Sequence, residues 1–185
     1  MSINDKGTIL TYTGKGFNIL QPRSDMFDIQ DIAHSLSMQC RYTGHCRLFY
    51  SVAQHSVYVS YQVPEGIALA ALLHDAAEAY TGDVSSPLKA LLPNYSALED
   101  RVQEYIYVKY LPYSLGTYAR CQIKQADLEL LVCEKRDLLP ESEPWGSLEG
   151  VRCLNDLIIH PHFSPELAKE EFLARFQELT ANTTH

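Results

Sequence analysis

The chain has 185 residues, 46% of them hydrophobic and 21% charged, a composition typical of one globular domain with a buried core over residues 1–185. Its formal net charge of -8 argues against a protein that wraps a nucleic-acid polymer or binds an anionic membrane surface. No apolar run approaches the roughly 18 residues of a membrane span, and the first ten residues lack a signal-peptide pattern. The odd number of cysteines, at irregular spacing, indicates free thiols in a reducing cytosol. We therefore expect a cytoplasmic protein.

The N-terminal part of the chain predicts a hairpin followed by two helices. β-Branched and aromatic residues on either side of a glycine-bearing turn predict strands over 8–13 and 17–20. Asp28 is a suitable N-cap for an amphipathic helix that runs to about Gln39, with apolar residues at i, i+3, i+4 and i+7. A second helix is predicted over about 51–62.

The remainder of the chain predicts further helices. An alanine-rich helix is expected from Glu65 until it is broken by residues 81–83, and longer helices are expected over about 95–110 and 117–138. A last helix is expected to begin at Ser164, where an N-cap residue is followed by proline. The predicted fold class is all-α, with a short N-terminal β-hairpin.

Residues 70–78 place charged side chains within an alanine- and leucine-rich stretch. On a helix, His74 and Asp75 can lie on the same side as Glu78, at spacings of four and three. Burial of unpaired charge is costly, so this group needs a partner. A divalent metal is one candidate, and a histidine satisfied by its own carboxylate neighbours is the alternative.

Two further residues extend this group. Asp127 follows Ala126 of an apolar stripe, so we expect it to point partly inward from the helix over 117–138. His55, from the helix over 51–62, supplies a second imidazole. Two imidazoles and two carboxylates form a mixed N/O site that suits Mn, Co, Fe, Ni or Zn better than calcium.

The sequence around these residues closely resembles the HD-domain metal-dependent phosphohydrolases, and within them the small bacterial and phage nucleotide hydrolases of the 5'-deoxynucleotidase type. The resemblance covers about 28–138. The segments that carry it are 52–56, 73–78, 82–89 and 124–127. It implies a compact HD-domain helical bundle and a mononuclear site for a divalent transition metal. The ligands that it implies are His55, His74, Asp75 and Asp127.

The resemblance also implies roles for residues around the metal. Glu78 matches the catalytic carboxylate that handles the proton of the attacking water or of the leaving oxygen, and Asp83 matches a residue that faces the deoxyribose. Arg41 and Tyr42 resemble an arginine–aromatic pair that contacts the substrate, although the nucleotidases typically have Trp at the second position. Phosphate-binding cations are expected at Lys89 and Lys124.

The function that the resemblance implies is metal-dependent hydrolysis of dNMP to deoxynucleoside and phosphate. The alternative is a dNTP triphosphohydrolase, for example one that converts dATP to deoxyadenosine and triphosphate, and a third hypothesis is a non-catalytic nucleotide-binding HD module. The family also implies a dimer or larger homo-oligomer. The sequence has no GxxxxGK[ST] phosphate loop, which argues against a P-loop NTPase.

Overall fold

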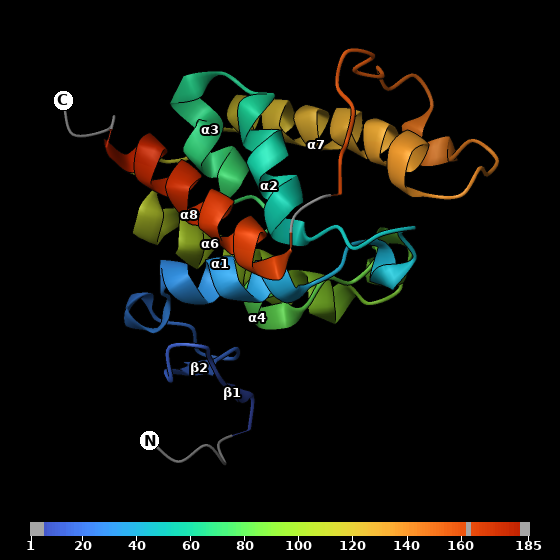
Figure 1. Ribbon diagram of the computed structural model, residues 1–185. Helices are drawn as coiled ribbons and strands as arrows, with labels where there is room; N and C mark the ends of the chain where they lie inside the picture. Colours follow the sequence, from blue (N-terminus) through green and yellow to red (C-terminus); the bar gives the residue numbers. More distant parts are fainter. Residues whose placement is uncertain (1–5, 162–163, 182–185) are drawn as a thin grey trace.

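The computed structural model describes residues 6–161 and 164–181, and these residues form a mostly helical fold with one small hairpin at its N-terminal end (Figure 1). The prediction of an all-α fold with a short N-terminal hairpin is confirmed. The helices in the described ranges are α1 (Ile29–Met38), α2 (Val52–Tyr61), α3 (Glu65–Leu72), α4 (Glu78–Thr81), α5 (Ser86–Lys89), α6 (Pro93–Tyr110), α7 (Thr117–Leu138) and α8 (Pro165–Ala181). Three short 3-10 helices are η1 (Ser24–Met26), η2 (Tyr42–Gly44) and η3 (Gly146–Leu148).

The hairpin forms where the sequence predicts it but is shorter than expected. Strand β1 (Thr8–Leu10) pairs antiparallel with β2 (Gly16–Asn18), and Ile9 lies opposite Phe17. The turn contains Gly14 with φ +81°, a conformation that favours glycine. Phe17 is buried against Tyr80 of α4, with their ring centroids 4.2 Å apart, so the hairpin is fixed to the helical core.

Several helices begin at the capping residues that the sequence supplies. The Asp28 side chain accepts a hydrogen bond from the backbone N–H of Gln30 at the start of α1, and Ser51 accepts one from Gln54 in α2. Ser164 accepts one from Leu167 at the start of α8. These caps satisfy N–H groups that a helix leaves unpaired in its first turn, and the predicted starts of these helices are confirmed.

The helices pack around one cluster of buried apolar residues. α1 packs against α2 and α8, and α2 also contacts α3, α7 and α8 (Figure 1). The α8 residues that point into this core include Ala168 and Phe172, both fully buried. Because α2 contacts both α3 and α7, His55, the residue of the predicted site that lies in α2, is fully buried.

The alanine-rich helix is not continuous as the sequence predicted. α3 ends at Leu72, residues 73–77 form successive turns, and helical structure resumes in the short α4. The N–H groups of Ala76 and Glu78 bond to the carbonyls of Leu73 and Asp75, which are three residues back rather than four. The apolar character of this segment correctly indicated burial, but it did not reveal the change in winding.

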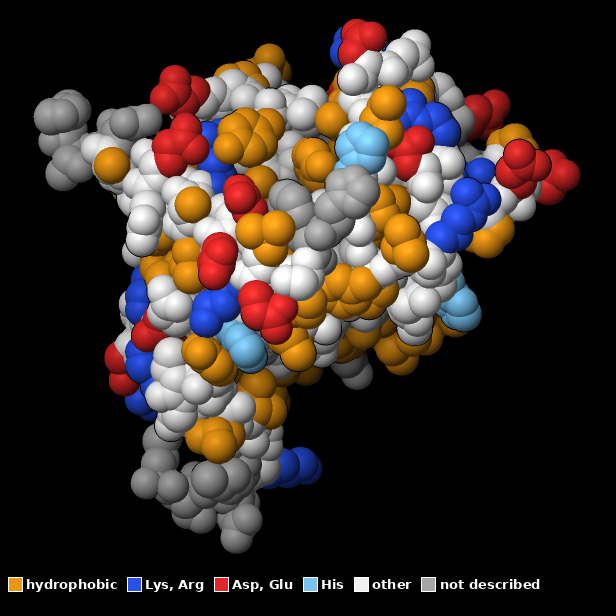
Figure 2. Space-filling model, viewed as in Figure 1, with side chains coloured by type: hydrophobic (Ala, Val, Ile, Leu, Met, Phe, Trp, Pro, Cys, Tyr) orange, Lys and Arg blue, Asp and Glu red, His pale blue; other side chains and the backbone are white. Residues whose placement is uncertain are grey.

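None of the described helices combines the length and the apolar character that crossing a membrane requires. On the face that Figure 2 shows, acidic and basic side chains are interspersed with apolar ones, so the excess negative charge is not gathered into one patch of that face.

Candidate active site

The turn at residues 73–77 presents His74 and Asp75 side by side. His74 Nδ1 lies 2.8 Å from the carbonyl oxygen of Ala71. Because a carbonyl only accepts, Nδ1 carries a proton and donates it, so Nε2 is the ring nitrogen that faces Asp75. Nε2 lies 3.1 Å from Oδ2 of Asp75. The turn therefore aims the Nε2 atom of an imidazole and a carboxylate oxygen toward the same point.

His55 and Asp127 meet this pair from two other helices. His55, in α2, is fully buried, and its Nε2 lies 3.2 Å from Oδ1 of Asp127 in α7 and 3.7 Å from Oδ2 of Asp75. Only 14% of the Asp127 side chain is exposed, so its predicted inward direction is confirmed. The structure thus brings together all four residues that the sequence predicts as metal ligands.

The donor atoms of this cluster fit a divalent transition metal. Single ligand atoms of His55, His74 and Asp75 all lie within 4.8 Å of one another. Within the described part of the chain, the buried Nε2 atoms of both histidines form no hydrogen bond, although each lies close to a carboxylate oxygen of the cluster. Buried polar atoms without a partner are costly, and two imidazole nitrogens beside two carboxylates form the mixed donor set that such metals prefer.

A residue that the sequence analysis missed supports His55. Glu134 of α7 is fully buried, and its Oε1 lies 2.6 Å from Nδ1 of His55. Burial alone would raise the pKa of Glu134, but the Arg41 guanidinium and His55 lower it to about 2. Burial and Arg41 lower the pKa of His55, whereas Glu134 and Asp127 raise it, with a net value of about 9. An ionised Glu134 accepts the Nδ1–H of His55, which directs Nε2 toward Asp127.

Glu78 lies at the start of α4, with 5% of its surface exposed. Its Oε1 accepts a hydrogen bond from Lys89 at 3.0 Å, while its buried Oε2 has no partner among the described residues. Burial and the nearby Asp75 carboxylate raise the pKa of Glu78 well above its ordinary value, although Lys89 opposes this. Lys89 also contacts Glu99 at 2.8 Å. A buried carboxyl with a raised pKa is suited to donate a proton.

Arg41 and Tyr42 lie beside the cluster on the segment that leads into α2. Arg41 Nη1 is 3.7 Å from Asp75 Oδ2, and its Nε donates to Glu134 at 3.2 Å. Tyr42 and Thr43 have φ values of 56° and 55°, an unfavourable left-handed conformation for residues other than glycine. Each such residue costs on the order of 1 kcal/mol and persists only when its surroundings fix it. The structure thus places this predicted substrate pair next to the predicted ligands.

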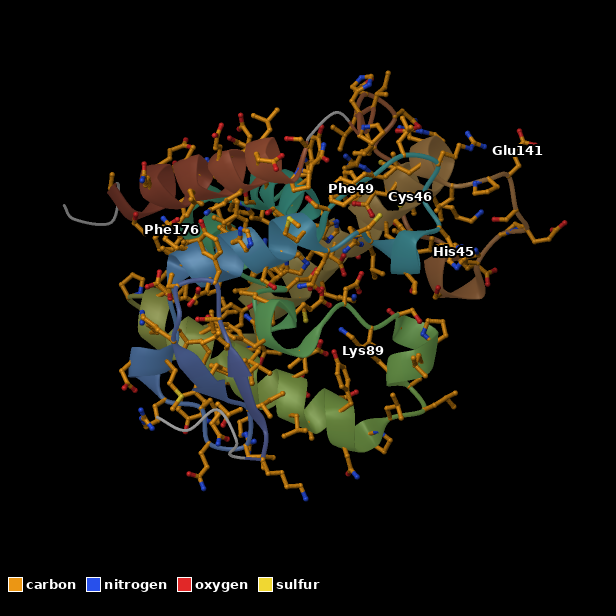
Figure 3. The ribbon with its side chains drawn as sticks, turned by 60° about the horizontal axis from the view of Figure 1, so that its bottom comes forward. His45, Cys46, Phe49, Lys89, Glu141 and Phe176 are labelled. Carbon is orange, nitrogen blue, oxygen red and sulfur yellow. The ribbon has the colours of Figure 1, made fainter. Side chains whose placement is uncertain are left out.

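The other predicted substrate residues lie around the same cluster. The Asp83 backbone N–H donates to Gln39 Oε1 at 2.8 Å, and burial raises the pKa of the Asp83 carboxyl. Lys124 pairs with Asp127 Oδ2 at 2.6 Å, and 66% of its side chain is exposed. α5 with Lys89 and the segment with His45 and Cys46 lie at the same end of the molecule (Figure 3).

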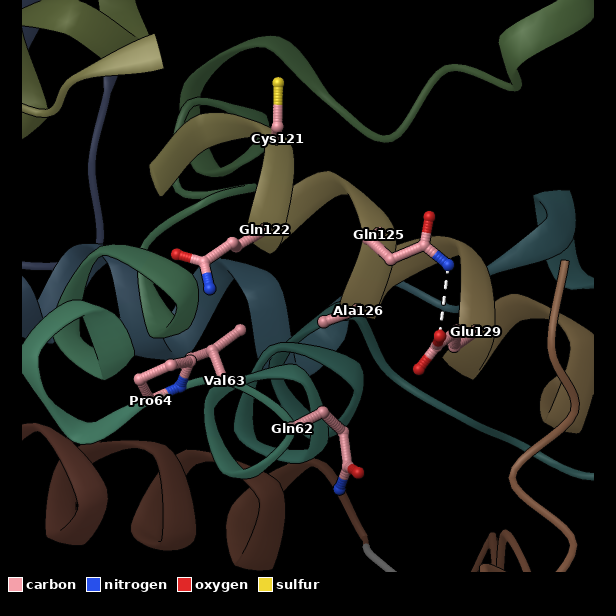
Figure 4. Close-up of a pocket in the computed structure, with 8 residues that line it drawn as sticks. All are labelled: Gln62, Val63, Pro64, Cys121, Gln122, Gln125, Ala126 and Glu129. Carbon is pink, nitrogen blue, oxygen red and sulfur yellow. Dashed lines mark hydrogen bonds between the residues drawn. The ribbon is translucent and has the colours of Figure 1, made fainter. Parts of the chain in front are cut away.

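A pocket of about 510 Å³ opens beside three of the four predicted ligands. It extends between α6 and α7, and its lining includes His74, Asp75, Asp127, Lys124, Arg120 and Tyr107. A second pocket, of about 420 Å³, lies between the α2–α3 connection and α7 (Figure 4). Its lining has three glutamines and no histidine, and its one carboxylate, Glu129, accepts a hydrogen bond from Gln125 at 3.0 Å. Of these two pockets, the one of about 510 Å³ is the one whose lining includes predicted metal ligands, namely His74, Asp75 and Asp127.

Gln103 of α6 holds the turn that carries His74 and Asp75. Its side-chain amide accepts from the N–H of Ala77 at 3.0 Å and donates to the carbonyl of Leu73 at 2.7 Å. Gln103→Leu leaves the N–H of Ala77 unpaired, at about 1–3 kcal/mol, and removes one of the two donors to the carbonyl of Leu73, which keeps the N–H of Ala76. We expect the free energy of unfolding, measured by urea denaturation, to fall by about 2 kcal/mol or more. Gln125→Leu, on the exposed side of α7, is the control, and equal stability of the two variants would contradict this prediction.

The fold and the site define a mostly helical protein with a largely buried cluster of two imidazoles and two carboxylates. No family model matches the chain. The chain is 42% identical to the uncharacterized protein YfdR of Escherichia coli (strain K12) over 174 residues, which are 93% of this chain and 95% of that protein. It is also 35% identical to an uncharacterized protein of Rhodobacter capsulatus over 126 residues, 62% of this chain and 64% of the relative. The chain therefore belongs to the YfdR family.

Proposed function

We propose that this protein is a metal-dependent phosphohydrolase of deoxynucleotides, which converts dNMP to deoxynucleoside and phosphate. The observation that carries the proposal is the convergence of His55, His74, Asp75 and Asp127. Both histidines use Nδ1 for hydrogen bonds to a carboxylate or a carbonyl and keep Nε2 for a ligand. The resemblance of the surrounding segments to HD-domain phosphohydrolases supports the same function.

The proposed reaction forms a bond from a water oxygen to phosphorus, breaks the P–O5' bond and returns a proton to the nucleoside oxygen. A divalent transition metal bound by the four ligands supplies Lewis-acid activation of water and of a phosphoryl oxygen. Glu78, whose pKa is raised by burial, donates the proton to the leaving oxygen. Arg41, whose Nη1 already lies near Asp75, binds the negative charge of the phosphate.

A second candidate reaction is removal of the whole triphosphate from a dNTP. It uses the same ligands and the same Glu78. The observation that favours it is the pocket beside the ligands, whose lining includes Lys124 and Arg120; a polyphosphate would take these two cations from their present partners, Asp127 and Glu104. Charge neutralisation by such side chains is what a polyphosphate leaving group requires.

One incubation separates these possibilities. The metal-loaded protein is mixed with each dNMP and dNTP, and the products are separated by chromatography. Inorganic phosphate from dNMP supports the first reaction, and triphosphate from dNTP supports the second. Nucleotide binding without any product would identify a non-catalytic nucleotide-binding module and contradict both reactions.

We predict that deoxynucleotides are better substrates than ribonucleotides, because Tyr42 packs against the nucleoside and an added 2'-hydroxyl crowds this wall. Apolar contact of this kind discriminates by about 10²-fold. The measurement is kcat/KM for dAMP against AMP and for dATP against ATP. Tyr42→Ala is expected to reduce the ratio, while Tyr42→Phe, which keeps the ring, is expected to retain it. Equal values within each wild-type pair would reject a deoxy-specific site.

A further inference from the structure

The carboxylate of Glu134 accepts hydrogen bonds from four side chains. The side chain is fully buried in α7, and its donors all come from residues 41–55, on the segment that leads into α2 and in α2 itself. They are His55 Nδ1 at 2.6 Å, the Tyr50 hydroxyl at 2.8 Å, the Tyr42 hydroxyl at 2.6 Å and Arg41 Nε at 3.2 Å.

The two oxygens of Glu134 divide these donors between the two halves of the site. Oε1 accepts from His55, a predicted metal ligand, and from Tyr50. Oε2 accepts from Arg41 and Tyr42, the predicted substrate pair. One rigid carboxylate group thus fixes the orientation of an imidazole and of a substrate-binding segment at the same time.

The conformation of that segment gives an independent reason to look for such a constraint. Tyr42 and Thr43 are consecutive residues in the left-handed region, at φ 56° and 55°. Backbone hydrogen bonds from Gly44 to Arg41 and from His45 to Tyr42 close the turn, and the Tyr42 side chain is tied to Glu134. Unfavourable backbone conformations that are held in this way commonly occur at ligand-binding segments.

We infer that Glu134 is a positioning residue that couples the metal site to the substrate segment. Through Oε1 it keeps Nε2 of His55 directed at the metal, and through Oε2 it keeps Arg41 and Tyr42 directed at the nucleotide. The inference rests on the proposed function for its substrate half, whereas its metal half depends only on the four ligands. If Glu134 had only a structural role, its replacement would lower the stability of the protein but would leave the metal affinity and the KM of the folded variant unchanged.

The test uses the full-length protein with Co²⁺ as the probe. Glu134→Gln replaces one acceptor oxygen with an NH₂ group, so the side chain no longer accepts hydrogen bonds from both halves. We expect the affinity for Co²⁺ to fall by about 10–100-fold, the usual effect of losing an outer partner of a histidine ligand. The visible absorption of bound Co²⁺ should shift as well, and KM for the nucleotide should rise.

Two hydroxyl deletions separate the halves. Tyr42→Phe removes a donor to Oε2 only, so KM should rise while the Co²⁺ affinity and spectrum remain those of the wild type. Tyr50→Phe removes a donor to Oε1 but keeps the hydrogen bond from His55 and both donors to Oε2, and it controls for general loss of stability. If Glu134→Gln does not fold, Tyr42→Phe still tests the half of the inference that concerns Oε2.

The inference would be overturned if folded Glu134→Gln bound Co²⁺ with the affinity and the spectrum of the wild type. An unchanged KM in Tyr42→Phe would overturn it as well. Failure of the proposed function has a different signature. In that case the wild-type protein turns over no nucleotide, while the loss of Co²⁺ affinity in Glu134→Gln is still observed.

Discussion

His74→Ala and Asp75→Asn are each expected to abolish metal binding and turnover together. Each variant removes one of the converging ligand atoms, and the two atoms lie 3.1 Å apart in a turn whose backbone is held by Gln103. Because the remaining ligands come from separate helices, they cannot move to replace the missing donor without repacking the core. Elemental analysis of the purified variants and a nucleotide hydrolysis assay are the measurements.

Matched variants show whether the loss is specific. His34→Ala removes an imidazole that stacks on Tyr12, with ring centroids 3.8 Å apart, and Asp156→Asn alters an exposed carboxylate. Both should keep the metal content and the rate of the wild type. Full metal occupancy in His74→Ala or in Asp75→Asn would contradict the ligand assignment.

The sequence predicts well those parts of the fold that depend on local signals. α7 has the bounds expected from its apolar period, and α1, α2 and α8 begin beside the polar caps at Asp28, Ser51 and Ser164. These signals lie within a few residues of the element that they specify, so they are readable without knowledge of the tertiary structure.

The break between α3 and α4 depends on residues far away in the sequence. Alanine and leucine favour a helix through residues 70–77, yet the amide of Gln103 pairs with the carbonyl of Leu73 and the N–H of Ala77. α6, which supplies Gln103, is folded against this turn by packing that composition does not show. Local propensity is here overridden by tertiary contacts.

The site shows the same division between local and distant information. Asp127 was predictable because it adjoins the apolar stripe of α7. Glu134 lies seven residues later, two helical turns along the same face, so the period that placed Asp127 inward could also have identified it. Its neighbours Lys135 and Arg136 resemble an ordinary charged helix end, and the partners that make its burial favourable come from the segment around residues 41–55.

The roles of Lys89 and Lys124 in phosphate binding stay predictions, and in this structure both pair with carboxylates.

Glu78→Gln is expected to retain the metal and to lose about 10²-fold or more in rate, the usual scale for loss of a general acid or base. The amide can still accept the hydrogen bond from Lys89, so the surroundings remain satisfied. The acid form of Glu78 is the proton donor, and burial and Asp75 raise its pKa. Activity is therefore present below this pKa and falls as pH rises through it. The variant should lack that alkaline decrease.

Glu99→Gln is the matched control, because Glu99 also pairs with Lys89, at 2.8 Å against 3.0 Å for Glu78. It changes the other carboxyl that pairs with the same lysine but leaves the carboxyl that we assign as the proton donor. We expect the pH profile of the wild type with a much smaller change in rate. The measurements are metal content by elemental analysis and kcat against pH for both variants. Loss of the metal in Glu78→Gln would show that Glu78 is a ligand instead. Equal loss of rate in both variants would show that the pairing of these carboxyls with Lys89, rather than proton donation by Glu78, limits the reaction.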